Sequence, residues 1–294
     1  MSDPIPALPC WLDGELSNVL EAKVSVLDRG FIFGDGVYEV VPAYGGRPFR
    51  FDEHMARLDR SLGEMRMRNP LDRAGWRGVV EQLIAAYAQH VGKPPAETNQ
   101  LVYLQVTRGV AWRDHAMPPG IAPTAFAMVN RLYIYSAEER ARGVACVTAD
   151  DFRWKKAHIK TTSLAGAVLA RQVSADVGAN ETIMFRDGSL SEAAASNVWV
   201  VKGGSVLGPP RDHLVLEGIR YGLLEELCRE AGIPFELRRV SREEVLSADE
   251  ILLSSATKEV IACTRLDGRP VGNGKPGPIY ERLFAGYQQA KQGS

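Results

Sequence analysis

The sequence predicts a protein of mixed α and β structure that folds into two domains. Its 294 residues are enough for two packed domains. Strand-like and helix-like patterns alternate in the first part of the chain, whereas the second half is richer in strand-like segments. We expect a connector at residues 131–136 to separate an N-terminal domain, residues 1–130, from a C-terminal domain, residues 137–294.

A hairpin followed by two helices is expected near the start of the N-terminal domain. Tyr44-Gly45-Gly46-Arg47 is typical of a tight turn, with strands at residues 39–43 and 48–51 on its two sides. Asp52 is expected to cap one helix and Asp72 the next. Apolar residues then recur at helical spacing and predict two buried stripes. These residues are Met55, Leu58, Leu62 and Met65 in the first helix, and Trp76, Val79, Val80, Leu83, Ile84 and Tyr87 in the second.

The rest of the chain supplies further strands and two more helices. Strands at residues 101–107 and 124–129 flank a loop rich in proline and glycine, residues 117–123. In the second half, strands are expected at residues 144–148, 182–186, 197–201 and 250–253, and helices at residues 163–177 and 219–231. Turns are expected at residues 187–188, 203–204 and 267–268.

Composition and charge exclude several classes of protein. The formal net charge is −1, so no basic surface for nucleic acid or for an anionic membrane is expected. No apolar stretch is long enough to span a bilayer, and the first residues do not resemble a signal peptide. The four cysteines are far apart in the sequence, so we expect no zinc site and no disulfide framework, and a cytoplasmic location. The Glu53-His54 pair lacks a second histidine at metal-binding spacing, so no metal is assigned.

Two residues suggest cofactor chemistry. Lys160 is expected to open a helix, and Glu192 follows 32 positions later in a segment of small residues. A lysine amine can form a Schiff base with the aldehyde of pyridoxal phosphate (PLP), and a carboxylate can keep the pyridine nitrogen protonated. On its own the pair is weak evidence, because most lysines are solvated surface residues. The surrounding motifs therefore decide the interpretation.

Four elements of the sequence together resemble the class IV aminotransferases, which are PLP enzymes of fold type IV. These elements are the segment Asp28–Glu39 (Asp-Arg-Gly-Phe-Ile-Phe-Gly-Asp-Gly-Val-Tyr-Glu), Arg57 in the helix that follows, Lys160, and the segment Glu192–Asn197. They occur in the order typical of the family, and the resemblance covers nearly the whole chain. It implies a small N-terminal α/β domain, a larger C-terminal pseudo-barrel domain and a homodimer.

The resemblance implies PLP as the cofactor and gives roles to individual residues. Lys160 matches the Schiff-base lysine, which also moves the substrate α-proton. Glu192 matches the partner of the pyridine nitrogen, and Arg57 matches a phosphate ligand. Arg153 matches a residue near the phenolic oxygen, where a cation stabilises the phenolate. The other cofactor contacts implied are Ser196, Asn197, Leu216, Gly218, Ile219, Arg220, Ser255, Ala256 and Thr257.

Two of these contact groups leave alternatives open. Gly218 and Ile219 are expected to offer backbone N–H groups to the phosphate at a helix start. Many relatives have threonine at the position of Ala256, so here either the hydroxyl of Thr257 or backbone N–H groups would serve. Leu216 either packs against a face of the cofactor ring or is ordinary core.

The expected substrate follows from a second motif. Family members that act on D-amino acids carry an Arg-x-His pair, matched here by Arg113 and His115, which with Tyr38 surrounds the substrate α-carboxylate. The guanidinium group suits a carboxylate because its geometry matches the two oxygens. The resemblance therefore implies amino transfer from a D-amino acid, such as D-alanine, to a 2-oxo acid, such as 2-oxoglutarate or pyruvate.

Three other functions stay open at this point. The first is a transaminase of the same fold with L-branched-chain or (R)-amine specificity. The second is a lyase of the aminodeoxychorismate type, and the third is a PLP-binding protein without turnover. Trp112 and His158 lie near the expected site in the sequence, where each would either narrow the substrate pocket or simply pack.

Overall fold

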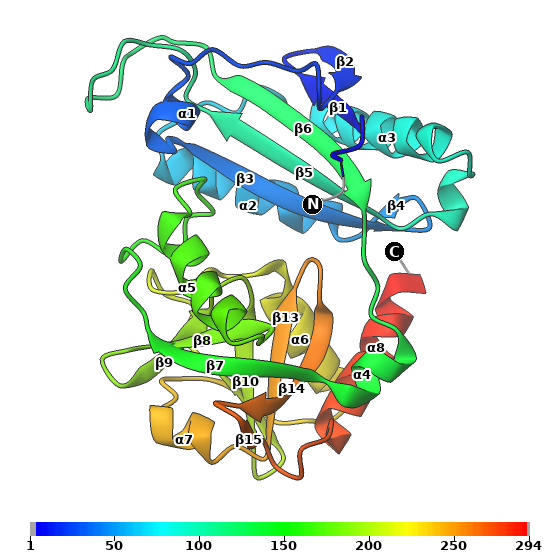
Figure 1. Cartoon of the computed structure of the whole chain (residues 1–294), viewed down its shortest axis with the longest axis vertical. Helices are drawn as coiled ribbons and strands as arrows, with labels where there is room; N and C mark the ends of the chain where they lie inside the picture. Colours follow the sequence, from blue (N-terminus) through cyan, green and yellow to red (C-terminus); the bar gives the residue numbers. More distant parts are fainter. Residues whose placement is uncertain (1–3, 293–294) are drawn as a thin grey trace. The chain divides into compact units, whose positions relative to one another are not determined.

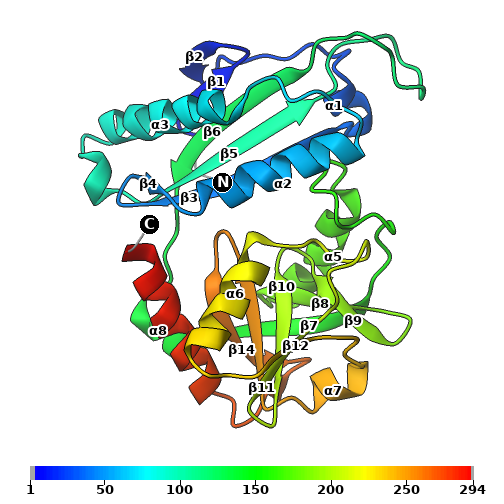
Figure 2. The same cartoon turned by 180° about the vertical axis from the view of Figure 1, so that it is seen from behind.

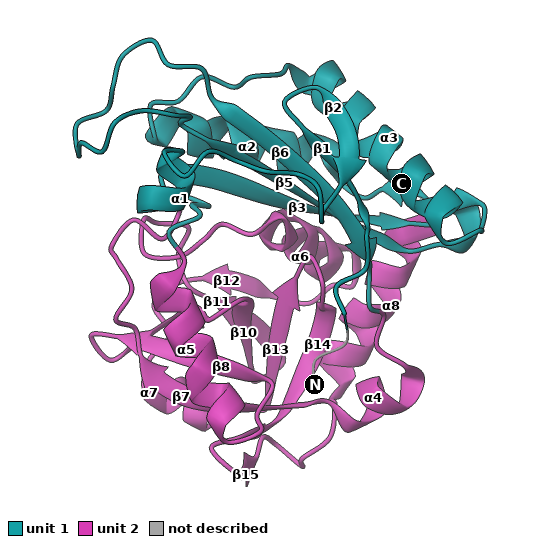
Figure 3. Ribbon diagram, turned by 45° about the horizontal axis from the view of Figure 1, so that its top comes forward, with its two compact units in different colours: residues 1–133, 159–163, 294 teal, residues 134–158, 164–293 magenta. Residues whose placement is uncertain are grey.

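The computed structural model describes residues 4–292, which form two compact units (Figure 3). Among these residues, unit 1 comprises the chain up to Tyr133 together with Ile159–Ser163. Unit 2 comprises Ile134–His158 and the chain from Leu164 onward. Lys160 therefore belongs to unit 1, although the chain on both sides of its short segment belongs to unit 2.

Unit 1 is built on a six-stranded antiparallel sheet with the strand order β2-β1-β6-β5-β3-β4 (Figure 1). Its strands are β1 (Pro9–Leu12), β2 (Glu15–Asn18), β3 (Gly36–Tyr44), β4 (Arg47–Pro48), β5 (Gln100–Thr107) and β6 (Thr124–Arg131). Its helices are α1 (Arg29–Phe33), α2 (Phe51–Glu64), α3 (Arg73–His90) and a single 3₁₀ turn (Pro95–Glu97). The hairpin expected at Gly45-Gly46 is confirmed as the turn between β3 and β4.

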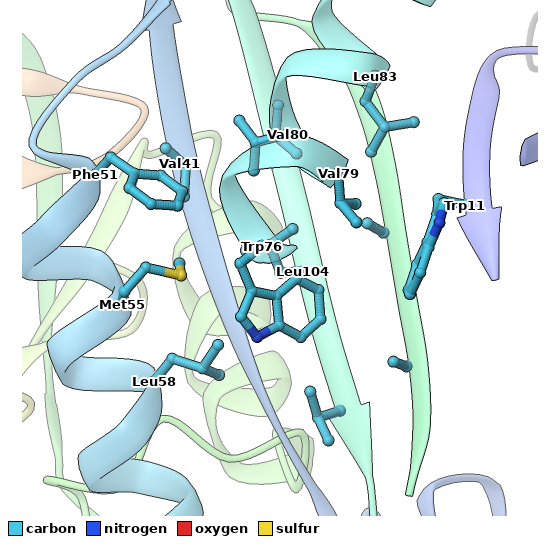
Figure 4. Packing of buried hydrophobic residues seen from close by; sticks show 14 of the residues in the cluster. Trp11, Val41, Phe51, Met55, Leu58, Trp76, Val79, Val80, Leu83 and Leu104 are labelled. Atoms are coloured by element: carbon cyan, nitrogen blue, oxygen red, sulfur yellow. The ribbon is translucent and has the colours of Figure 1, made fainter. Parts of the chain in front are cut away.

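Helices α2 and α3 lie side by side on one face of this sheet (Figure 2) and bury the predicted apolar stripes. In the core, Trp76 of α3 packs near Leu104 of the sheet, and Met55 and Leu58 of α2 point toward the same interior (Figure 4). Met65, at the end of the α2 stripe, is only partly buried. Burial of one helical face against a sheet supplies most of the stability of such helices.

One of the two predicted helix caps is wrong. Asp72 accepts a hydrogen bond from the Gly75 N–H and caps α3, as expected. Helix α2 instead begins two residues earlier, after Arg50 in a left-handed conformation, and Asp52 lies in its first turn. The earlier start buries the ring of Phe51 in the core, and an acidic residue in the first turn still interacts favourably with the helix dipole.

Unit 2 is built on a nine-stranded sheet with the order β12-β11-β10-β13-β14-β7-β8-β9, and β15 pairs with β14. The strands are β7 (Val144–Asp150), β8 (Glu181–Arg186), β9 (Ser189–Ala193), β10 (Asn197–Lys202), β11 (Ser205–Gly208), β12 (Phe235–Leu237), β13 (Glu250–Ser255), β14 (Glu259–Leu266) and β15 (Arg269–Pro270). Ser189 of β9 forms a β-bridge with Ser241, which follows β12, so the two ends of the sheet approach each other. The expected curled, barrel-like sheet is confirmed.

In the described part of unit 2, the helices around this sheet are α4 (Ala137–Arg142), α5 (Ala165–Asp176), α6 (Ile219–Glu230), α7 (Arg242–Leu246) and α8 (Pro278–Gln292). Helix α5 packs on β7 and β8, whereas α6 packs on β12 and β13 and also contacts α8 (Figure 2). None of the helices in the described part of the chain is sufficiently long and apolar to cross a membrane.

The expectation that Lys160 opens a helix is wrong, because α5 begins only at Ala165. The lysine instead lies in an extended segment beside β3, where Thr161 forms a β-bridge with Val37. The side chain of Thr161 also donates to the Gly36 carbonyl, and the Thr162 N–H donates to the same oxygen. These bonds to β3 satisfy the backbone of the segment without a helix.

Candidate active site

Strand β3 and helix α2 hold Lys160 within unit 1. The Lys160 carbonyl accepts a hydrogen bond of 2.9 Å from the Tyr38 N–H, and the Lys160 N–H lies 3.3 Å from Ser61 Oγ. The lysine Nζ is 4.1 Å from the centroid of the Tyr38 ring, and that ring stacks on Tyr103. A cation over an aromatic face is favourable. The backbone of Lys160 is therefore held in place, and its amine lies against a defined aromatic ring.

Arg57 lies one helical turn before Ser61 on α2, but it is not an exposed helix residue. Its Nε and Nη2 donate to the two carboxylate oxygens of Glu39 at 2.6 and 2.9 Å. His54 Nδ1 lies 2.7 Å from the same carboxylate. Burial raises the pKa of the Glu39 carboxyl, but Arg57 and His54 outweigh this effect and hold the pKa well below its usual range.

The expected carboxylate-binding residues have different neighbours in the structure. Arg113 and His115 stand on the exposed loop between β5 and β6, where both contact Phe33. The guanidinium carbon of Arg113 is 5.4 Å from the centroid of the Phe33 ring, and the centroid of the His115 ring is also 5.4 Å away. Tyr38 instead contacts Lys160 and is half-buried.

A buried network that the sequence did not reveal holds this loop to α1. Arg29 donates through Nη1 to the Asp114 carbonyl and through Nε to Asp35 at 2.7 Å. Arg108 also binds the Asp35 carboxylate, at 2.7 and 3.0 Å. Burial raises the pKa of Asp35, but the two guanidinium groups lower it below its usual value. Asp35 therefore stays ionised and links the loop to the segment before β3.

In unit 2, Glu192 is a buried carboxylate with three donors. Arg153 Nη1 donates to Oε1 at 2.6 Å, while the Leu216 N–H (3.2 Å) and Asn197 Nδ2 (3.4 Å) donate to Oε2. Burial raises the pKa of Glu192, and the adjacent Arg153 opposes that shift. The other edge of Arg153 binds Asp151 at 2.9 Å. The sequence did not predict the contact between Arg153 and Glu192.

The hydrogen bonding of Glu192 fits a group that presents one further N–H. An ionised carboxylate accepts about four hydrogen bonds, and the three donors found in the described chain leave one position for another N–H. Asn197 also donates to the Leu216 carbonyl at 2.9 Å. A Cβ atom on Gly218 would lie 2.1 Å from Asn197 Oδ1, so the approach of these segments requires glycine.

Two features of unit 2 could receive a phosphate. Helix α6 begins after Gly218 with no side-chain cap, so its first N–H groups carry the positive end of the helix dipole. The helix packs on β13, whose end leads into the second feature, the turn before β14. There the hydroxyls of Ser255 and Thr257 are 3.2 Å apart, and the Lys258 N–H donates to Ser255 Oγ.

The remaining expected residues have other surroundings. Ser196 is buried and donates to Glu181 at 3.0 Å. Arg220 is buried in α6 with its guanidinium 5.5 Å from the Tyr287 ring centroid. Trp112 is 84% exposed, and His158 Nδ1 lies 3.4 Å from the His213 carbonyl oxygen. Among the residues between 4 and 292, no group of three or more potential metal ligands was found.

Comparison with known proteins gives consistent matches. Residues 36–266 match the model of the amino-transferase class IV family. The chain is 35% identical over 278 residues to D-alanine aminotransferase of Bacillus licheniformis, with 95% of both chains covered. It is also 35% identical over 280 residues to D-alanine aminotransferase of Staphylococcus haemolyticus, covering 95% of this chain and 96% of the relative.

Solved structures support the fold. A branched-chain amino acid aminotransferase from T.th., solved with pyridoxamine 5'-phosphate, superimposes with a TM-score of 0.87. The match covers 99% of this chain and 96% of that one, at 23% identity. At this level of identity the similarity concerns the fold alone.

The pairing of Glu192 with Arg153 predicts a pH-dependent loss of stability in Arg153→Met. Without the guanidinium, burial raises the pKa of Glu192 further. At low pH the carboxyl is protonated and its burial costs little, whereas above its pKa it becomes an uncompensated buried charge, which costs about 3–5 kcal/mol. The variant should therefore lose more stability relative to the wild type at about pH 8 than at about pH 5 in urea unfolding.

The control is the double variant Arg153→Met/Glu192→Gln, in which Asp151 has also lost Arg153 but no carboxylate stands at position 192. The extra loss at high pH should disappear in this variant. An equal loss of stability at both pH values in the single variant would show that Glu192 does not depend on Arg153.

Proposed function

The chain belongs to the class IV aminotransferases, and we propose that it transfers the amino group of a D-amino acid, such as D-alanine, to a 2-oxo acid, such as 2-oxoglutarate or pyruvate. Similarity to two D-alanine aminotransferases over 95% of the chain supports this substrate class. The structural observation that supports the proposal is the buried Glu192, which is held by Arg153 and has three donors, so that its carboxylate can accept one further hydrogen bond.

The cofactor is pyridoxal 5'-phosphate, and the residues present fit it. Lys160 would attach it, and Glu192 would accept a hydrogen bond from its ring nitrogen. Arg153 would lie near the phenolic oxygen, and Leu216 against a ring face. The expected phosphate contacts are Arg57, Gly218, Ile219, Ser255, Ala256 and Thr257, and the further expected cofactor contacts are Ser196, Asn197 and Arg220.

The structure gives less support to a side-chain role for two of those further cofactor contacts. Ser196 and Arg220 are buried and have partners inside unit 2, Glu181 and Tyr287 respectively. A role through the backbone N–H therefore suits both residues better than a role through the side chain. The N–H groups at the start of α6 and the hydroxyls of Ser255 and Thr257 are the better candidates, because they lie at a helix end and a turn.

The chain contributes a base, a charge partner and a carboxylate receptor. When bound, PLP supplies an electron sink for the charge left when the α-proton of the amino acid is removed. Lys160 takes that proton and returns it. Ser61 holds the backbone of this lysine, and its amine lies over the ring of Tyr38, so the position of the amine is defined. Burial raises the pKa of Glu192, and Arg153 opposes that shift and so favours the ionised carboxylate, which can hold a proton on the ring nitrogen. Arg113 and His115 bind the substrate carboxylate.

The stereochemistry of the substrate is tested by absorption spectroscopy. The purified protein should show a visible cofactor band that D-alanine removes with release of pyruvate, while L-alanine leaves it unchanged. The matched Lys160→Ala variant should release no pyruvate with either amino acid, because it lacks the amine that moves the proton. A band that responds to L-leucine but not to D-alanine would replace the proposal with branched-chain transamination. Pyruvate release from an aminodeoxychorismate-type substrate without any 2-oxo-acid acceptor would replace it with the lyase.

The carboxylate receptor is tested by Arg113→Ala. Removing the guanidinium should raise KM for D-alanine at least about tenfold, equivalent to about 1.4 kcal/mol, because a charge-assisted bond to the carboxylate is lost. The affinity for PLP should change less than about twofold. Arg131→Ala removes another exposed arginine of unit 1 and should leave KM unchanged. The same KM in the Arg113 variant and the wild type would exclude this role.

We further propose that the protein is a homodimer. Helix α5 and the residue after it expose several apolar side chains in unit 2, among them Val168, Leu169 and Val177, each more than 60% exposed. Phe152 and Trp154 are also about half exposed in the same unit. Grouped apolar side chains on a surface commonly mark an interface.

The homodimer is tested by light scattering after gel filtration, which should give a mass of twice the 32.2 kDa of one chain. The Leu169→Asp variant should have a lower mass, because it places a charge among these apolar side chains. A mass of one chain for the wild-type protein would contradict the proposal.

A further inference from the structure

A buried cluster of three polar side chains in unit 2 includes two residues, Lys258 and Glu181, that have no place in the chemistry described so far. Lys258 Nζ donates to Glu181 Oε2 and to Ser196 Oγ, each at 2.9 Å. Ser196 Oγ in turn donates to Glu181 Oε2 at 3.0 Å, which closes the ring of contacts. Glu181 is fully buried, and only 15% of the Lys258 side chain is exposed.

Two members of the cluster are direct neighbours of proposed cofactor contacts. Lys258 follows Thr257 in the turn between β13 and β14, and its own N–H donates to Ser255 Oγ at 3.1 Å. Ser196 precedes Asn197, which donates to the Leu216 carbonyl and to Glu192. The cluster therefore joins the proposed phosphate turn to the corner of β9 and β10 that carries the partner of the ring nitrogen.

The arrangement favours a structural role for Lys258 over a direct ionic contact between its ammonium group and the phosphate. An ammonium group has three donors, and two of them are used by Glu181 and Ser196. Its charge is neutralised by the Glu181 carboxylate in a buried pair. Such a pair is costly to break, because the remaining partner becomes an uncompensated buried charge. The turn is thus tied to β8 and to the corner before β10 by a contact that resists displacement.

We propose that Lys258 is a positioning residue: with Glu181 and Ser196, it sets the position of the Ser255–Thr257 turn relative to Glu192 and Asn197, so that the cofactor phosphate and ring nitrogen are held at the same time. The inference rests on the function proposed above. Its consequence is that loss of Lys258 affects the binding of a cofactor with a phosphate more than the binding of the same ring without one.

The test compares the affinities of the apoenzyme for PLP and for pyridoxal, which has the same ring and aldehyde but no phosphate. In Lys258→Met, the Kd for PLP should rise at least about tenfold, whereas the Kd for pyridoxal should rise less than about threefold. Lys258→Arg keeps the charge and should recover most of the PLP affinity. The double variant Lys258→Met/Glu181→Gln removes both charges, so it should fold without a buried unpaired carboxylate and still bind PLP weakly.

Val271→Ala controls for a general loss of stability. Val271 is buried in the core of unit 2 and bonds to Thr264, in the half of β14 remote from the turn. This variant should unfold at a lower temperature and keep the wild-type ratio of the two Kd values. An equal rise of both Kd values in the Lys258 variants, or no rise in either, would overturn the inference. A wild-type protein that binds PLP no better than pyridoxal would instead overturn the proposed phosphate site itself, and with it the inference.

Discussion

A carboxylate can be buried in a protein only if a cation or several hydrogen bonds accompany it, and both units are organised around this constraint. In unit 1, Glu39 is bound by Arg57 and His54, while Asp35 is bound by Arg29 and Arg108. These contacts connect β3 to α2 and to the segment before it. The residues that define the N-terminal motif therefore serve first to place β3, on which the Lys160 segment is fixed.

Unit 2 has two buried carboxylates, Glu192 and Glu181, which meet the same constraint in different ways. Arg153 neutralises Glu192 from one side and leaves the carboxylate able to accept one further bond. Lys258 neutralises Glu181 from inside the protein, and Ser196 completes the contacts of that carboxylate. The first arrangement leaves a carboxylate that can accept another donor, whereas the second uses both charges of the pair within the protein. The two carboxylates are nevertheless linked through the short segment from Ser196 to Asn197.

The sequence predicted regular elements well where the pattern was local. The alternation of β5 and the buried stripes of α2 and α3 depend only on neighbouring residues, so periodicity revealed them. The start of α2 was misplaced because the burial of Phe51, a tertiary contact, decided it. The residue types of the candidate site were evident from the motifs, but their partners were not. Nothing in the local sequence shows that Arg57 meets Glu39 or that Arg153 meets Glu192, since both contacts join separate elements.

Because Ile159–Ser163 belong to unit 1, this unit can complete its contacts only after part of unit 2 has been synthesised. The ribosome completes β3, α2 and the rest of the six-stranded sheet before it makes these residues, and the intervening Ile134–His158 already belongs to unit 2. Unit 1 therefore emerges with the contacts on Gly36, Tyr38 and Ser61 still unmade, and it acquires them only when the later segment arrives. A fragment that ends at Tyr133 would lack the segment that carries Lys160, so the nascent chain cannot gain the amine of this lysine until synthesis has passed into the second unit.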